Sequence, residues 1–167
     1  MAQEVESNQG SSLSEEARQL VAANRRGVLG TLLPKDGYPY ASMVEYAPLP
    51  DGDVILFLSR LAEHQKYLTA DPRVSLLIAP DIMAENALAQ PRVSLVGRAE
   101  PAEDRPAMAE IYLQYHPGAR PYINFGDFQF YRLRVEFTST SDWAWLGFDD
   151  SSAFLGVRVM ETSWETL

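Results

Sequence analysis

The sequence contains no cysteine and only two histidines, His64 and His116, among its 167 residues. Without cysteine there is no disulfide framework, no thiol nucleophile and no thiolate-ligated metal. Transition-metal sites are built largely from clustered histidine and cysteine side chains. Two histidines and no cysteine therefore predict that the protein has no dedicated transition-metal site.

Positive charge is also scarce: 14 lysines and arginines stand against 23 aspartates and glutamates, giving a formal net charge of −9. A nucleic-acid-binding surface needs a basic face, so the composition predicts no nucleic-acid partner. No apolar run approaches the ~20 residues of a membrane-spanning helix. The first residues, MAQEVESNQGSS, lack the basic and apolar regions of a signal peptide. These absences predict a soluble, cytoplasmic protein without a membrane partner.

Short apolar segments separated by turn residues dominate the chain, and such segments are typical of strands. Strands are expected at Val28–Leu33, Tyr38–Ala47, Val54–Leu58, Val74–Ile78, Arg92–Ala99 and Phe128–Phe137, with a weaker candidate at Trp143–Gly147. Helices are expected from Ser12 to Asn24, from Ser59 to Ala70 and from Glu103 to Gln114. Strands in hairpin order with helices between them predict a mainly β protein, an antiparallel β-barrel with peripheral α-helices.

The length fits one domain with tails. Residues 1–12 are polar and predict a disordered N-terminal tail. Residues 13–147 hold the expected strands and helices of the barrel domain. Residues 148–167 show little hydrophobic period and are expected to form a C-terminal tail without a clear structure.

The segment from Val54 to Pro80 reads as a strand, a short helix and a second strand. Ser59 follows the first strand and is a good N-cap residue. A helix start binds anions, phosphate above all, through its free amides and its dipole. Arg60, His64 and Lys66 lie within the next two turns and could add donors or charge. The alternative is a capped surface helix with solvated charges, in which His64 is packed against its neighbours.

Three stretches, LSRLAEHQKYLTADPRVSLLI, PYASMVEYA and RVSLVGRAEP, resemble the flavin-binding split-barrel superfamily. That superfamily includes pyridoxamine 5'-phosphate oxidase and the haem-utilisation proteins, and the resemblance is greatest to the haem-utilisation type. It covers roughly residues 20–136. The resemblance implies an antiparallel split barrel that dimerises and holds flavin mononucleotide (FMN) in a cleft to which both subunits contribute.

The resemblance also assigns roles to individual residues. It implies that the FMN phosphate lies near Ser42 and Ser59, with further contacts from Arg60, His64 and Lys66. The flavin ring would lie along the strand residues Met43, Val44 and Glu45, with Arg92 as a polar contact to the ring. No strand–G-x-G-x-x-G–helix unit is present, so FMN is expected rather than a flavin dinucleotide.

The sequence departs from the oxidase in the segment Ala62-Glu63-His64, where that enzyme carries a phosphate-binding Ser-Arg-Lys. The predicted function is therefore an FMN-binding oxidoreductase of the haem-utilisation type, with pyridoxamine phosphate as a poor candidate substrate. The alternative is a non-catalytic dimeric barrel that carries flavin or haem. A homodimer is expected in either case, with aromatic residues between Tyr122 and Tyr131 in the core and at the dimer contact.

Overall fold

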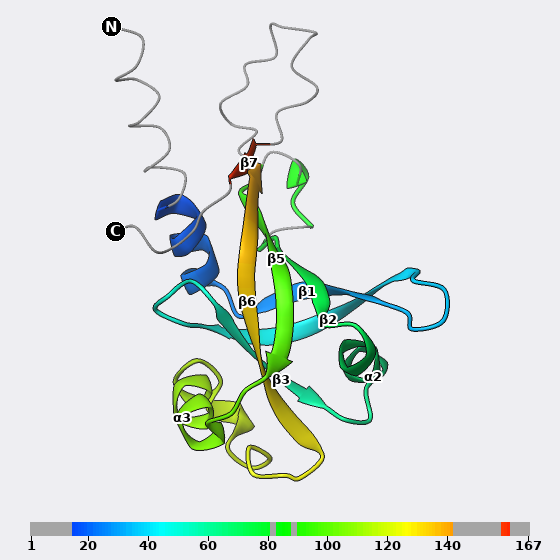
Figure 1. The fold of residues 1–167 in the computed structure, drawn as a ribbon. Coiled ribbons are helices and arrows are strands. Elements are labelled where there is room, and N and C mark those ends of the chain that lie inside the picture. Colours follow the sequence, from blue (N-terminus) through cyan, green and yellow to red (C-terminus); the bar gives the residue numbers. More distant parts are fainter. Residues whose placement is uncertain (1–14, 81–82, 88–89, 142–157, 161–167) are drawn as a thin grey trace, which may run out of the picture.

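The structure, a computed structural model, describes residues 15–80, 83–87, 90–141 and 158–160. Its seven-stranded sheet has the order β3-β2-β1-β4-β5-β6-β7, and an additional antiparallel pairing of β3 with β6 closes six of the strands into a barrel (Figure 1). The strands are β1 (Arg26–Leu32), β2 (Pro39–Pro48), β3 (Val54–Ser59), β4 (Arg73–Ile78), β5 (Arg92–Pro101), β6 (Phe128–Ser141) and β7 (Arg158–Met160).

The mainly β barrel predicted from the sequence is confirmed, and the first six strands coincide with the predicted segments within a few residues. All pairings between strands are antiparallel. A turn that contains Lys35-Asp36-Gly37 joins β1 to β2, and Gly37 adopts a φ of 68°, which glycine tolerates without strain. The candidate strand at Trp143–Gly147 lies outside the described residues, as do residues 1–12.

Two hydrophobic clusters hold the barrel and its helices together. The first fills the barrel and contains Val44, Leu56, Leu76, Leu95 and Leu133. The second lies outside the barrel wall, where β3 and β6 pack against helix α3 (Arg105–Tyr115). Because β3 is buried on both faces, its sequence reads as a continuous apolar run without alternation.

In the part of the chain that the structure describes, three helices and the 3₁₀ segment η2 lie around the barrel (Figure 1). Residues 15–23 form the N-terminal helix, and helix α2 (Glu63–Ala70) follows β3. Helix α3 begins after Asp104, whose carboxylate accepts a hydrogen bond from the Ala107 amide at 3.0 Å, and η2 (Pro117–Ala119) follows it. The sequence therefore correctly predicted a helix after β3 and another after β5.

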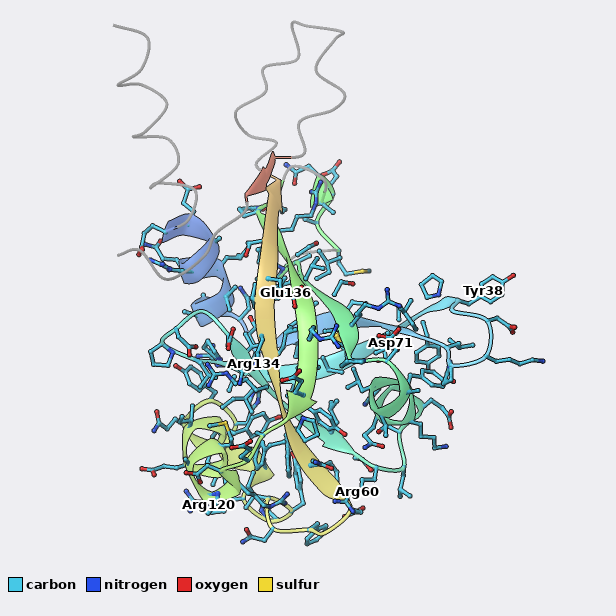
Figure 2. All side chains as sticks on the ribbon, viewed as in Figure 1. Tyr38, Arg60, Asp71, Arg120, Arg134 and Glu136 are labelled. Carbon is cyan, nitrogen blue, oxygen red and sulfur yellow. The ribbon has the colours of Figure 1, made fainter. Side chains whose placement is uncertain are left out.

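The predicted start of helix α2 was wrong. Ser59 is the last residue of β3, and its hydroxyl accepts a hydrogen bond from the Leu61 amide in a turn. The Arg60 amide donates to the Asp127 carbonyl at 2.7 Å, which prolongs the β3–β6 pairing beyond the strand (Figure 2 shows Arg60 at this turn). The helix therefore begins only at Glu63, with Ala62 as an N-cap that makes no side-chain bond.

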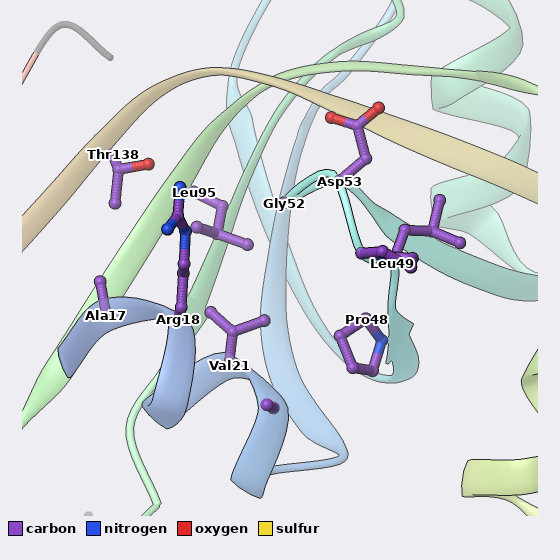
Figure 3. Close-up of a pocket in the computed structure, with 11 residues that line it drawn as sticks. Ala17, Arg18, Val21, Pro48, Leu49, Gly52, Asp53, Leu95 and Thr138 are labelled. Atoms are coloured by element: carbon purple, nitrogen blue, oxygen red, sulfur yellow. The ribbon is translucent and has the colours of Figure 1, made fainter. Parts of the chain in front are cut away.

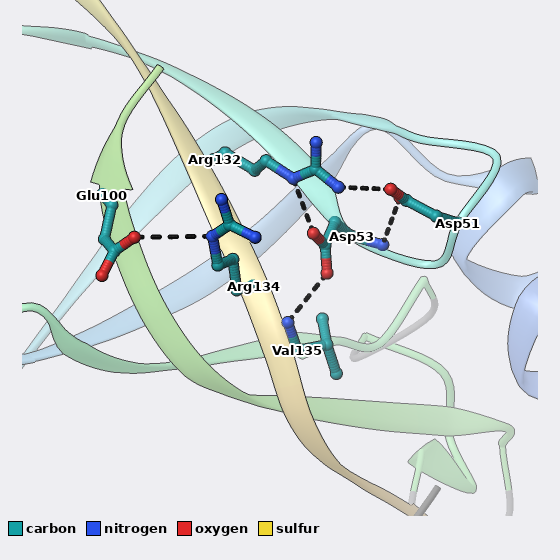
Figure 4. Close-up of polar contacts among 6 residues, drawn as sticks. All are labelled: Asp51, Asp53, Glu100, Arg132, Arg134 and Val135. Atoms are coloured by element: carbon teal, nitrogen blue, oxygen red, sulfur yellow. Dashed lines mark hydrogen bonds and ion pairs between the residues drawn. The ribbon is translucent and has the colours of Figure 1, made fainter. Parts of the chain in front are cut away.

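A polar clamp fixes the turn between β2 and β3 to β6 (Figure 4). Asp53 accepts hydrogen bonds from Arg132 Nε at 2.6 Å and from the Val135 amide at 3.0 Å. Asp51 pairs with the other side of the Arg132 guanidinium. The carboxylate of Asp53 is largely buried, with 12% of its side chain exposed.

Substituting Asp53 with alanine is expected to lower the free energy of unfolding by about 2–3 kcal/mol, because it leaves Arg132 Nε and the Val135 amide without their acceptor, while Asp51 keeps only its own contact with the guanidinium. Glu100→Ala is the matched control. It breaks the Glu100–Arg134 pair at 3.4 Å, whose side chains are 48% and 62% exposed, and should cost less than about 0.5 kcal/mol. Urea unfolding measures both values, and equal losses in the two variants would contradict the clamp.

Candidate functional site

An open cleft of about 270 Å³ lies against the outer face of β2 and the end of β3. The start of α2 closes one end, and α3 with the loop before β6 forms the other wall. The cleft is lined by Met43, Val44, Glu45, Phe57, Leu58, Ser59, Ala62, His64, Tyr112, Tyr122 and Phe128. It is therefore an aromatic and aliphatic hollow with a few polar groups at its edges, which is the usual composition of a small-molecule site.

His64 occupies the edge of the cleft at the start of α2. Its Nδ1 lies 3.1 Å from the Ser42 hydroxyl, so β2 and α2 are joined by a polar contact at this point. The side chain is half-buried, and this burial lowers the pKa of His64 below its usual value. His64 is therefore neutral at pH 7. When the Ser42 hydroxyl donates to Nδ1, Nε2 carries the proton; when Nδ1 donates to Ser42, Nε2 is a free ligand nitrogen.

Glu45 lies at the opposite end of the cleft. Its carboxylate is 3.4 Å from Arg26 Nε and 3.7 Å from Nδ1 of His116. His116 is buried, stacks on Tyr112 at 4.4 Å between ring centroids, and its Nε2 donates to the Tyr46 carbonyl at 2.7 Å. Burial raises the pKa of Tyr112 well above its usual range, so this wall presents a neutral phenol beside a carboxylate.

The floor of the cleft is a packed aromatic group centred on Phe57. Its ring lies 4.9 Å from Phe128 and 4.3 Å from Phe130, and it stacks on Tyr122 at 6.2 Å. Aromatic side chains between Tyr122 and Tyr131 were predicted to serve the core and a dimer contact. Within the described chain most of them belong to the core, and Phe125 is the large exposed one.

The structure brings together six of the nine residues predicted for the site. Met43, Val44, Glu45, Ser59 and His64 line the cleft, and Ser42 contacts it through His64. These residues come from β2, from the end of β3 and from α2, so the predicted grouping of separate segments matches one hollow in the structure. Their role in binding a cofactor stays a prediction.

The three remaining residues lie outside the cleft lining. Lys66 is exposed, and its ammonium is 2.6 Å from the Glu63 carboxylate on the same helix. Arg60 follows Ser59 with an exposed side chain. Arg92 pairs with Ser141 at one end of β6, whereas the cleft lies at the other end, at Phe128. Within one chain Arg92 does not line this cleft, and its contact with a cofactor stays a prediction.

Sequence reasoning missed the wall formed by α3 and the loop before β6. Tyr112 and Tyr122 line the cleft, and His116 stands behind Glu45. His116 occupies the C-cap position of α3. The side chains of Met108, Ile111, Tyr112 and Tyr115 pack in the second cluster, but the spacing of apolar residues in a helix does not say which strands it will cover.

The chemistry of the cleft fits a planar aromatic ring better than a phosphate dianion. Among the described residues that line it there is no lysine or arginine, and Glu45 adds a carboxylate. At the start of α2, Glu63 occupies the first turn and pairs with Lys66, so the favourable position for an anion already has a negative group beside it. A phosphate here would depend on Ser59, Ser42 and backbone amides.

A second, smaller cavity of about 150 Å³ separates the N-terminal helix from the turn between β2 and β3 (Figure 3). Ala17, Val21 and Leu95 contribute apolar side chains to it. The Thr138 hydroxyl faces this region and has no hydrogen-bond partner within the described part of the chain. The two linings have no residue in common, so this cavity is separate from the aromatic cleft.

Across the residues that the structure describes, no group of three or more histidine, aspartate or glutamate side chains is placed to hold a metal ion. No helix in the same ranges is long and apolar enough to cross a membrane.

A closed antiparallel barrel with peripheral helices and an aromatic cleft beside β2 defines a split-barrel protein. The chain belongs to the pyridoxamine 5'-phosphate oxidase family, whose sequence model matches residues 13–141. The family predicted from the sequence is thereby confirmed.

Several relatives are haem proteins by name. The chain is 40% identical over 139 residues to the chloroplastic heme oxygenase HOZ of Arabidopsis thaliana, a match that covers 80% of this chain and 42% of HOZ. It is 32% identical to a heme binding protein of Mycobacterium smegmatis, with a TM-score of 0.71 and coverage of 88% of this chain and 57% of that one.

A third similar structure is the heme storage protein HutZ of Vibrio cholerae, at 21% identity and a TM-score of 0.61, covering 73% of this chain and 89% of HutZ. At this identity the likeness shows the fold alone. The chain spans about half the length of HOZ and of the mycobacterial protein.

Proposed function

We propose that this protein binds haem in the cleft between β2, α2 and α3. The observation that carries the proposal is the position of His64, a neutral imidazole at the edge of an aromatic hollow. Neutral imidazole is the form that ligates iron. The haem relatives HOZ and the mycobacterial heme binding protein support the choice of ligand.

Each part of the cleft has a defined role in this proposal. His64 supplies a nitrogen ligand, and the Ser42 hydroxyl fixes the orientation of its ring through the other nitrogen. Phe57, Tyr122 and Phe128 provide apolar surface for a flat macrocycle. Bound haem would supply a redox-active iron, and the surrounding chain would control its orientation and its access to water.

A titration of the purified protein with haemin tests the proposal. A Soret band that shifts and saturates at one haem per chain is expected, with a dissociation constant in the micromolar range or tighter. A spectrum that remains that of free haemin at every ratio would overturn it. Addition of ascorbate in air to a complex that forms then separates an oxygenase, whose Soret band decays, from a carrier, whose band persists.

FMN is the second candidate, in an oxidoreductase as the sequence predicted. The family and the approach of the β2 strand to the cleft at Met43, Val44 and Glu45 favour it. Here the phosphate would contact Ser59, and also Lys66 once that ammonium leaves its pair with Glu63. The double variant Ser59→Ala with Lys66→Ala should then weaken FMN binding more than tenfold, because a charge-assisted contact contributes roughly 1.5–3 kcal/mol. Flavin fluorescence measures this, with Arg73→Ala as control; unchanged affinity would remove the phosphate from this helix start.

A homodimer completes the proposed site. The cleft in one chain has a volume of about 270 Å³, below the ~300–1,000 Å³ of pockets that bury small molecules. Met43 lines the cleft and is exposed, and Tyr38 and Tyr40, farther along the same hairpin, are exposed as well. These apolar side chains could pack against a second copy and roof the cleft.

Light scattering at micromolar concentration tests the dimer. The parent is expected to have the mass of two chains, and Met43→Glu is expected to shift it toward one, because a carboxylate would be buried at the contact. Met83→Glu is the control, since Met83 is 90% exposed away from β2. A monomeric parent would count against the shared cleft.

A further inference from the structure

A hydroxyl group without a partner faces the cavity between the N-terminal helix and the turn from β2 to β3. The Thr138 side chain is 6% exposed, and within the described part of the chain its Oγ1 is the buried side-chain polar atom that lacks a hydrogen bond. Such a hydroxyl has lost its bonds to water on folding, so native structures rarely leave one without a partner. This atom therefore indicates that the cavity takes an occupant with a polar group.

The pairing of β5 with β6 directs the hydroxyl into the end of the barrel. Thr138 lies directly opposite Leu95, and the side chains of directly paired residues share one face of a sheet. Leu95 is buried in the cluster that fills the barrel, so Thr138 points inward as well. Thr138 also pairs with Met160 on β7, which holds its backbone from the other side. The hydroxyl is therefore kept at the cavity by the sheet.

The rest of the lining suits an apolar body of limited size. Apolar side chains come from the N-terminal helix, the β2–β3 turn and β5, namely Ala17, Val21, Leu49 and Leu95. The cavity has a volume of about 150 Å³, and an apolar cavity of ~150 Å³ admits a molecule of the size of benzene. Water filling this space would amount to about five molecules at ~30 Å³ each, and each ordered water needs two to four polar partners. A ring with one polar atom fits this lining better than water does.

The charged groups at the cavity favour a neutral ligand. Among the described residues that line it, Arg18 is the cation and Asp53 the anion. Both carboxylate oxygens of Asp53 already accept hydrogen bonds, from Arg132 Nε and from the Val135 amide. Figure 3 shows the Arg18 side chain at the same end of the cavity as Thr138. Because the two charges are opposite, an ionised ligand attracted by one would be repelled by the other.

We propose that this cavity binds a small neutral molecule whose apolar body has about the size of one six-membered ring and whose single hydroxyl or carbonyl oxygen bonds to Thr138. The ring fills the apolar space between the N-terminal helix and the barrel. A carbonyl oxygen accepts the Thr138 proton, and a ligand hydroxyl either accepts it or donates its own. The site shares no lining residue with the aromatic cleft, so it stands independently of the function proposed there.

Benzyl alcohol and toluene are the probes, because they share the ring and differ in the hydroxyl. In methyl spectra of the parent, both should shift the resonances of Val21 and Leu95, which line the cavity. Benzyl alcohol should bind with a dissociation constant of about 1 mM or tighter, as its eight heavy atoms allow. Val44 and Leu58 report on the aromatic cleft. Shifts confined to those two residues, or no shift at Val21 and Leu95 well above the expected constant, overturn the site.

Thr138→Val tests the hydrogen bond, since it keeps the side-chain shape and removes the hydroxyl. The affinity for benzyl alcohol relative to toluene should fall about 2–10-fold, and an unchanged ratio overturns the proposed contact. In the ligand-free protein the same variant should melt about 2–4 °C higher, because a buried hydroxyl without a partner is lost. A lower melting temperature would show that the hydroxyl already has a partner, and would also overturn the proposal.

Ala17→Leu tests the location by filling the cavity. Ala17 lines the cavity and is 6% exposed, so three added carbon atoms should abolish the binding of both probes. Ala23→Leu is the matched control: Ala23 lies on the same helix, is exposed and does not line the cavity, and the variant should bind as the parent does. Parental binding by a folded Ala17→Leu protein overturns the site. If that variant does not fold, the methyl shifts and Thr138→Val decide.

Discussion

Replacing His64 with alanine is expected to remove the Soret shift that accompanies haemin binding and to weaken binding at least about 100-fold. This magnitude follows from metal sites in general, where loss of a residue that only supports a ligand costs about 10–100-fold. His64 is the one imidazole among the residues lining the cleft, since Nε2 of His116 is already bonded to the Tyr46 carbonyl. Absorbance titration and the spectrum of the ferric complex measure the effect.

Ser42→Ala provides the graded companion to this variant. It removes the hydroxyl 3.1 Å from Nδ1 but leaves the imidazole in place, so a loss of haemin affinity of about tenfold with a recognisable Soret band is expected.

Because burial lowers the pKa of His64, haemin binding by the parent should hold as the pH falls through 6.5 and weaken only at more acidic pH. Parent-like binding by His64→Ala would place the iron ligand elsewhere.

Replacing Gly97 with alanine is expected to have the largest effect on the fold. Gly97 lies at the irregularity where the register between β5 and β6 shifts. A Cβ atom added there would lie 1.9 Å from the Arg134 carbonyl oxygen, which belongs to the backbone and cannot move aside as a side chain can. We expect a loss of at least about 4 kcal/mol, enough to leave a domain of ordinary stability largely unfolded or insoluble.

Gly126→Ala is the matched control for this prediction. A Cβ atom at Gly126 has no neighbour within 4 Å, so the same chemical change should alter the free energy of unfolding by less than about 0.5 kcal/mol. Thermal unfolding followed by circular dichroism compares the two variants. A Gly97→Ala protein that melts within a few degrees of the parent would show that β5 and β6 can separate locally at low cost.

Local sequence patterns determined the strands and most of the helices. The apolar run Val54–Leu58 reflects a strand that is buried on both faces, and the alternation along Tyr38–Ala47 reflects a strand that is buried on one face. Both patterns can be recognised without knowing which strand lies beside them. The three stretches that resemble the split-barrel superfamily also predicted the family, which the match of the family model to residues 13–141 confirms. The absence of cysteine excluded a thiol nucleophile, and the excess of acidic residues predicted that the protein has no nucleic-acid partner.

The start of α2 shows where local patterns were insufficient. Ser59 has the residue type of an N-cap, but the bond from the Arg60 amide to the Asp127 carbonyl holds this point beside β6, and residues 60–62 form a turn before the helix begins. That partner is 67 positions away and is brought near only by the pairing of β3 with β6. Lys66, expected near a phosphate, instead pairs with Glu63 one helical turn before it.

The sequence by itself determined the family, the places of the strands along the chain, and three of the segments that meet at the cleft, namely β2, the end of β3 and α2. Only the tertiary structure decided which side chains face one another there: His116 behind Glu45, Tyr112 and Tyr122 along the wall, and Arg92 at the far end of β6. The physical reason is that hydrophobic period depends on burial of each residue, whereas these contacts depend on the register at which β3 and β6 close the barrel. That register is set by the packing of both clusters together and is not encoded in any single segment.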